Sequence, residues 1–170
     1  IPNLPPFLFY RGSLRSDDTR AVAIIGTRLA SEEGLRRARK MAALLVAHGV
    51  TVLSGLARGI DTAAHEATLA SGGRTVAVLG TGILTTYPPE NEGLAARIIE
   101  SGGLVVSQFW PAQHPARYTF PRRNVVMSGL SQGSVVIEAS YTSGAKMQAR
   151  LALEHGRKAF LLKSLVDEHQ

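Results

Sequence analysis

The chain has 170 residues, of which 45% are hydrophobic, with 19 Lys or Arg, 13 Asp or Glu and no Cys. This length suits one domain with a sizeable core, and the apolar fraction excludes a mostly disordered chain. The lack of cysteine excludes a disulfide scaffold, a thiolate nucleophile and a cysteine-based zinc site. No apolar run reaches the length needed to span a bilayer, so we expect a cytoplasmic protein without membrane contact.

The charge balance favours a phosphate-rich partner. The formal net charge is +6, and 15 of the 19 basic residues are arginine. Arginine makes bidentate contacts with phosphate oxygens. Because net charge alone predicts only solubility and non-specific attraction, the positions of the arginines must decide between a binding site and a compositional bias.

The first 20 residues differ from the rest, since they are rich in proline and aromatic residues and then become charged. We predict an extended N-terminal arm over residues 1–20, which packs Phe7, Phe9 and Tyr10 onto a core domain formed by residues 21–170. The segment 110–121, with three prolines and a tryptophan, is predicted to be irregular.

From residue 21 onward, short β-branched runs alternate with longer stretches of helical period. The predicted strands are 21–25, 50–53, 75–79, 104–106, 134–137 and 158–162. The predicted helices are 33–48, 60–69, 92–99 and 144–154, and each is followed by a glycine that can end it. This alternation predicts an α/β fold, namely a Rossmann-like, doubly wound and mostly parallel sheet with helices on both faces.

In such sheets, ligands bind beyond the carboxyl ends of the strands. The predicted strand exits carry Gly, Ser or Thr, which let backbone N–H groups face an anion. Three exits add a cation (Arg28, Arg58 and Lys146), and Arg123 precedes the next strand. We therefore predict a phosphate-binding rim made of Gly26, Thr27, Arg28, Ser54, Gly55, Arg58, Gly59, Gly80, Gly82, Arg123, Asn124, Ser143, Gly144 and Lys146.

Four further residues have supporting roles in this prediction. Asp61, near a helix start, is expected to cap or to complement the helix dipole. His65, one turn later, is expected to hydrogen-bond Asp61. Three roles are open for Glu138, which can orient Arg123, contact a ribose hydroxyl or, in the enzyme alternative, act as a general acid. Phe120 either packs in the core or stacks a base beside the basic pocket.

The motifs of several ligand classes are missing. The sequence has no G-x-x-x-x-G-K-[ST] motif for a P-loop nucleotide site, no H-E-x-x-H motif and no G-x-S-x-G nucleophile elbow. Gly80 and Gly82 supply only half of the dinucleotide fingerprint, because Thr85 stands where the third glycine belongs. We therefore predict neither a catalytic residue nor a metal or organic cofactor.

Several stretches resemble the DNA-processing protein A (DprA/Smf) family. They are AIIGTR at 23–28, SGLARGIDTAAH at 54–65, VAVLGTG at 76–82, YPPEN at 87–91, FPRRN at 120–124 and EA at 138–139 with SGA at 143–145. The resemblance implies an extended Rossmann fold that binds single-stranded DNA without catalysis and loads the RecA recombinase during natural transformation and recombination. It also implies a homodimer and a basic DNA pocket at Arg58, Arg123 and Lys146.

The chain departs from the family pattern at three places in its second half. These are KMQA at 146–149 in place of an apolar pair and Thr-Ala, SQ at 107–108 in place of Ser-Glu, and LLK at 161–163 in place of Val-Pro-Gly. A divergent member that binds a nucleotide instead of a strand is one alternative. A nucleotide phosphoribohydrolase is another, although no Gly-Gly-x-Gly-Thr loop follows Glu138.

Overall fold

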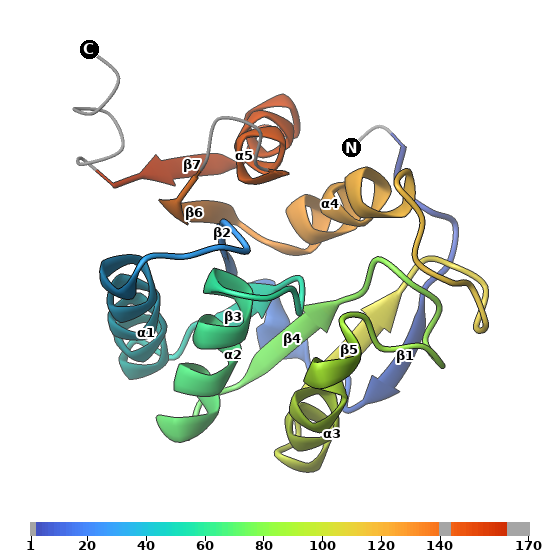
Figure 1. Cartoon of the computed structure of the whole chain (residues 1–170), viewed down its shortest axis with the longest axis horizontal. Helices are drawn as coiled ribbons and strands as arrows, with labels where there is room; N and C mark the ends of the chain where they lie inside the picture. The colour runs from blue at the N-terminus through green and yellow to red at the C-terminus, as the bar shows by residue number, and fades with distance from the viewer. Residues whose placement is uncertain (1–2, 140–143, 163–170) are drawn as a thin grey trace.

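A computed structural model describes residues 3–139 and 144–162 (Figure 1). The strands are β1 (Phe9–Gly12), β2 (Ala21–Gly26), β3 (Thr51–Ser54), β4 (Thr75–Val78), β5 (Leu104–Ser107), β6 (Gly133–Glu138) and β7 (Lys158–Leu161). The helices are α1 (Glu32–Ala47), α2 (Ile60–Ala70), α3 (Glu92–Glu100), α4 (Thr119–Leu130) and α5 (Gly144–Glu154). Single 3-10 turns lie at Ser16–Thr19 and Pro89–Asn91.

The seven strands form one sheet in the order β1-β5-β4-β3-β2-β6-β7. Strands β2 to β7 pair in parallel, and only β1 pairs antiparallel, with β5. The predicted mostly parallel, Rossmann-like sheet is therefore confirmed. After β5 the chain crosses back over the sheet through α4 and enters β6 on the other side of β2, so the strand order reverses between β2 and β6.

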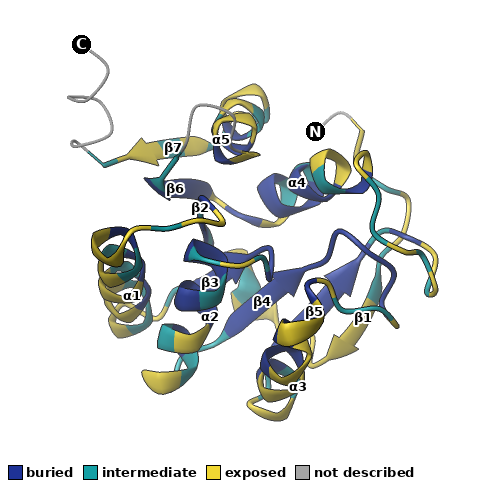
Figure 2. Cartoon of the chain, viewed as in Figure 1, coloured by how far each residue is buried: buried dark blue, intermediate teal, exposed yellow. Residues whose placement is uncertain are grey.

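Helices cover both faces of the sheet because neighbouring residues of a strand point to opposite faces. Ile24 packs with α1 and α2, in a cluster that includes Ala38 and Ala63, whereas the adjacent Ile25 packs with Met127 of α4 and Ala145 of α5. Strands β3, β4 and β5 are accordingly buried along their whole length, and β2 and β6 are mostly buried, as Figure 2 shows. Among the described residues, no helix combines the length and apolarity needed to cross a membrane.

The N-terminal arm adds a strand to the sheet edge, which its sequence did not predict. Phe9 and Tyr10 lie in β1, opposite Ser107 and Val106 of β5. Phe7 and Phe9 contact the Trp110 ring at centroid distances of 5.9 and 6.0 Å. Tyr10, which we expected to pack, is 52% exposed. The arm is thus held by backbone pairing and by one aromatic cluster.

Helix α4 corrects the prediction that the chain is irregular up to residue 121 and that Arg123 lies in a loop before a strand. Pro121 occupies the first turn of the helix, where its missing N–H would have no partner within the helix in any case. The residues that this helix buries include Thr119, Arg123, Asn124 and Ser128. Because these are polar, α4 lacks the apolar period that marks the other helices.

Arg74, just before β4, links the N-terminal arm to the loops at the amino-terminal ends of β4 and β5. Its guanidinium donates to both carboxylate oxygens of Asp18 (2.5 and 2.6 Å), to the Ser13 carbonyl (2.7 Å) and to the Gly102 carbonyl. The two charged side chains are only 12% and 22% exposed. This partly buried pair is therefore shielded from solvent.

We expect Arg74→Ala to lower the free energy of unfolding by about 1–3 kcal/mol, because it removes the guanidinium donor of the two carbonyls and leaves Asp18 with only the Thr51 hydroxyl as a side-chain donor. The β1 amides should also exchange faster in hydrogen exchange. Arg97→Ala, which removes an exposed pair with Glu66, is the matched control and should change stability little. Equal destabilisation by both variants, measured in urea, would contradict this account of the arm.

Candidate functional site

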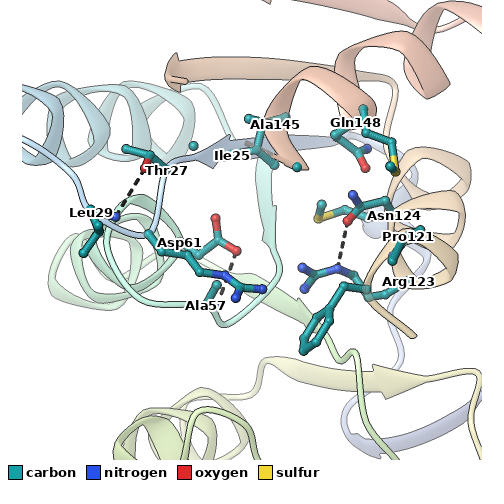
Figure 3. Close-up of a pocket in the computed structure, with 16 residues that line it drawn as sticks. Ile25, Thr27, Leu29, Ala57, Asp61, Pro121, Arg123, Asn124, Ala145 and Gln148 are labelled. Carbon is teal, nitrogen blue, oxygen red and sulfur yellow. Dashed lines mark hydrogen bonds between the residues drawn. The ribbon is translucent and has the colours of Figure 1, made fainter. Parts of the chain in front are cut away.

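A pocket of ≈430 Å³ lies at the point where the strand order reverses (Figure 3). From β2 the chain leads to α1 and β3 on one side, whereas from β6 it leads to α5 and β7 on the other, which opens a crevice at the carboxyl ends of the strands. The pocket is lined by Ile25, Gly26, Thr27, Arg28, Leu29, Ala57, Asp61, Phe120, Pro121, Arg123, Asn124, Met127, Gly144, Ala145, Met147 and Gln148.

The loop after β2 is fixed on both sides. The Thr27 N–H donates to the Glu138 carbonyl of β6 (2.8 Å), and the Thr27 carbonyl accepts from the Ile60 N–H at the start of α2 (3.3 Å). Gly59 makes this approach possible, because it has a φ of +73° and a Cβ there would lie 2.5 Å from the Thr27 oxygen. The space at Gly26 is equally narrow, since a Cβ added there would lie 2.4 Å from the Ile60 side chain. The loop therefore holds Arg28 at the pocket.

Arg28 is exposed and reaches across the pocket mouth to α4. Its guanidinium carbon lies 5.0 Å from the centroid of the Phe120 ring, a cation–π contact. The Phe120 ring in turn lies 5.9 Å from the Tyr87 ring. An exposed cation and two aromatic rings thus share one edge of the pocket.

Arg123 is buried and ties α4 to the sheet. Its Nη1 donates to the Gly55 carbonyl (2.6 Å) and the Val78 carbonyl (2.9 Å), and its Nε donates to Asn124 Oδ1 (3.0 Å). A Cβ at Gly55 would lie 1.9 Å from Nη1, so only glycine fits beneath the guanidinium. Burial lowers the pKa of Arg123, and the nearby Asp61 carboxylate opposes this shift.

Asp61 holds the loop between β3 and α2. Its Oδ2 accepts from the N–H groups of Gly55 (3.0 Å) and Ala57 (3.4 Å). Burial raises the pKa of Asp61, whereas Arg123 and these two N–H donors lower it. The side chain thus stabilises the loop that precedes α2 and, contrary to the expected capping role, accepts no hydrogen bond from an N–H group of the helix itself among the bonds described.

Arg58 is exposed beside the same rim, where it pairs with the exposed Glu90. The hydrogen bond that Arg58 donates to the Glu90 carboxylate raises the pKa of Arg58 and keeps the guanidinium charged. Arg58 lines a small neighbouring pocket of ≈30 Å³ together with Arg28, Arg123 and Tyr87. The structure thus brings three of the four predicted cations together.

The fourth cation, Lys146, is exposed on the first turn of α5 but does not line the pocket. Helix α5 instead turns Gly144, Ala145, Met147 and Gln148 toward it. Among the described residues, the nearest atom to a Cβ at Gly144 would be Asn124 Nδ2 at 4.0 Å. Ser143, which we also predicted, lies outside the described residues.

Three predicted phosphate contacts have packing roles in the structure. The Gly82 N–H donates to the Gln113 carbonyl (2.8 Å), and a Cβ at Gly82 would lie 2.1 Å from the Trp110 oxygen. At Gly80 a Cβ would lie 2.7 Å from the Phe120 ring. The Ser54 hydroxyl is fully buried and donates to the Ile24 carbonyl (2.7 Å). None of the three lines the pocket.

Two expected partnerships also need correction. The Glu138 carboxylate accepts from the Ser31 N–H (3.2 Å) and hydroxyl (2.8 Å), so it holds the start of α1 and does not orient Arg123. His65 Nδ1 lies 2.7 Å from Thr75 Oγ1 and is not hydrogen-bonded to Asp61. Within residues 3–139 and 144–162, no group of three or more His, Asp or Glu side chains is placed to hold a metal ion.

The sequence analysis missed Met127, Met147 and Gln148, which line the pocket from α4 and α5. A methionine or glutamine on a helix carries no motif of its own. The only signal at two of these positions was the departure from the family pattern at residues 146–149.

We expect the buried His65 to make stability depend on pH. Burial lowers its pKa from 6.5 to about 3, so the unfolded chain binds a proton there that the folded chain does not. The free energy of unfolding should therefore fall as the pH drops from about 6.5 toward 3, with a loss of about 2 kcal/mol by pH 5. His65→Asn should flatten this pH dependence in urea unfolding, and an unchanged slope would contradict the assignment.

Comparison with known proteins identifies relatives of nearly the whole chain. A model of the family described as DNA recombination-mediator protein A matches residues 1–170. Protein Smf of Escherichia coli is 45% identical over 158 residues, which cover 93% of this chain and 42% of the relative. The chain thus spans less than half the length of that protein.

Two solved structures share the fold. DNA processing protein A (DprA) of Streptococcus pneumoniae superposes with a TM-score of 0.82 and 36% identity, over 95% of this chain and 61% of that one. DNA processing protein A of Helicobacter pylori, solved for its single-stranded DNA binding mode, has a TM-score of 0.87 and 28% identity, over 95% and 74%.

Proposed function

The chain belongs to the DNA recombination-mediator protein A family, and we propose that it binds single-stranded DNA, without catalysing a reaction on it, across the pocket between β2 and β6. The observation that carries this proposal is the gathering of Arg28, Arg58 and Arg123 around one crevice at the carboxyl ends of the strands. The relative from Helicobacter pylori, whose structure is described for its single-stranded DNA binding mode, supports the choice of ligand.

The arginines have different roles in this proposal. Arg28 and Arg58 are exposed, so their guanidinium groups contact phosphates directly. Arg123 is buried and hydrogen-bonded, so it contributes its positive charge to the pocket floor while it holds α4. The open backbone at Gly144, at the N-terminus of α5, offers N–H groups to a phosphate, and the exposed Lys146 attracts the strand nearby.

Sequence preference from these contacts is slight, because phosphate contacts position a strand without reading its bases. Phe120 and Tyr87 add a stacking surface beside the phosphates, which every base can use. A strand that stacks on Phe120 displaces Arg28 from the ring and frees its guanidinium for a phosphate.

A mononucleotide is the second candidate ligand, since a pocket of ≈430 Å³ is within the size range of small-molecule sites. Titration with mononucleotides and with oligothymidylates of increasing length separates the two. Affinity that rises with length supports strand binding, whereas tight binding of a mononucleotide without length dependence supports a nucleotide sensor. A phosphoribohydrolase is disfavoured because Glu138, its candidate acid, is turned to Ser31.

We further propose, from family membership alone, that the strand-bound protein loads the RecA recombinase in recombination and natural transformation, that it works as a homodimer and that it acts in the cytoplasm. Sedimentation of the full-length protein tests the dimer. Capture of RecA on a protein–oligonucleotide complex, with the free protein and the free strand as controls, tests the recombinase contact.

Removing a phosphate-contacting arginine should weaken binding and reduce its salt dependence. We expect Arg28→Ala to bind oligothymidylate about tenfold more weakly at low salt, and to flatten the plot of log affinity against log salt by about 0.7. Arg39→Ala removes an exposed arginine from α1, away from the pocket, and is the matched control. If the two variants bind alike in fluorescence anisotropy, Arg28 is not a phosphate ligand.

Removing the partner of Arg58 should strengthen DNA binding, in contrast to removing an arginine. Glu90→Gln removes the carboxylate that competes with phosphate for Arg58, so binding should tighten by about twofold at low salt. Arg58→Ala should weaken binding, and the double variant should resemble Arg58→Ala. Tighter binding by Glu90→Gln in a chain that already lacks Arg58 would show that the effect is only one of net charge.

A further inference from the structure

Gln148 presents to the pocket an amide oxygen that has no hydrogen-bond partner among the described residues. The side chain is 1% exposed and lines the pocket from α5. Its Oε1 has no hydrogen-bond partner among the described residues, and its Nε2 makes only a long contact of 3.4 Å with the Ser134 hydroxyl. A buried acceptor without a donor is unfavourable, so a ligand that brings a donor is favoured at this place.

The surroundings of Gln148 fit a flat, partly polar group. Met127, Met147 and Ala145 line this part of the pocket, and methionine sulfur makes favourable contacts with aromatic rings. Figure 3 shows the Gln148 amide directed toward the space above Asn124, while Asp61 and Thr27 lie on the opposite side of the pocket. A nucleobase has the shape and the mixed polarity that such a site accepts.

We propose that the pocket seats one nucleobase of the bound strand and that Gln148 Oε1 accepts a hydrogen bond from the exocyclic amino group of that base. This inference rests on the proposed strand binding and adds a base preference at one position. An amino group projects from the ring and carries no acceptor. Because Gln148 Nε2 faces Ser134, only the Oε1 acceptor meets the base, and the two carbonyl oxygens that flank the ring N–H of thymine would be brought against it.

The amide is free to turn toward the base. The terminal torsion of glutamine has a broad energy profile, so a small rotation brings Oε1 toward the base while Nε2 stays on the Ser134 side. Glutamine and asparagine use the same amide oxygen to accept from the exocyclic amino group of adenine in DNA, on its major-groove edge.

The test compares oligonucleotides of 5-methylcytosine and of thymine, which share the methyl group and differ at the base edge. We expect wild-type protein to bind the 5-methylcytosine strand about threefold to tenfold more tightly in fluorescence anisotropy. Gln148→Leu, which keeps the volume and removes the acceptor, should bind both strands equally. Gln148→Glu, which keeps an acceptor, should retain the preference while it binds both strands more weakly.

Gln108→Leu removes a glutamine that does not line this pocket and is the matched control, expected to keep the wild-type preference. Equal binding of the two strands by wild-type protein would overturn the inference without touching strand binding. So would a preference that survives in Gln148→Leu. Failure of wild-type protein to bind either strand would instead overturn the proposed function. The comparison of the two strands with wild-type protein tests the inference even if a variant does not fold.

Discussion

The pocket depends on one buried guanidinium. Arg123 donates to carbonyls at the ends of two central strands, which fixes the start of α4 against the sheet. The same contacts place Phe120 beside the mouth of the pocket, where its ring supports Arg28. A residue that packs the core therefore also sets the position of the exposed cation and keeps a positive charge beneath it.

The strand order explains why the cations meet at this place. β2 and β6 are adjacent and parallel, but the chain leaves them in opposite directions, so side chains from separate loops face one crevice. Close packing of those loops requires glycine at Gly55 and Gly59, where a Cβ would collide with Arg123 or with the Thr27 carbonyl. Gly55 thus permits the close approach of a side chain and Gly59 that of a backbone carbonyl, whereas at Gly144 the nearest described atom to a Cβ is Asn124 Nδ2 at 4.0 Å.

Most of the fold could be predicted because buried parallel strands are uniformly apolar and the main helices have an apolar stripe. The exceptions have physical reasons. Helix α4 buries polar residues, and β1 has four residues that are held by pairing with β5 rather than by a buried face. The sequence also located the loops that carry Arg28 and Arg58. It could not distinguish a glycine that packs, such as Gly82, from one that faces a ligand, nor show that Gln148 turns into the pocket.

A crystal structure of the protein with a short oligothymidylate tests the central claim most directly. The account predicts that the strand lies over the crevice between β2 and β6, with phosphate oxygens within hydrogen-bond distance of the Arg28 and Arg58 guanidinium groups. The claim would be contradicted by a strand bound elsewhere, for example along the β1 edge of the sheet, with Arg28 still on the Phe120 ring and Arg58 still paired with Glu90.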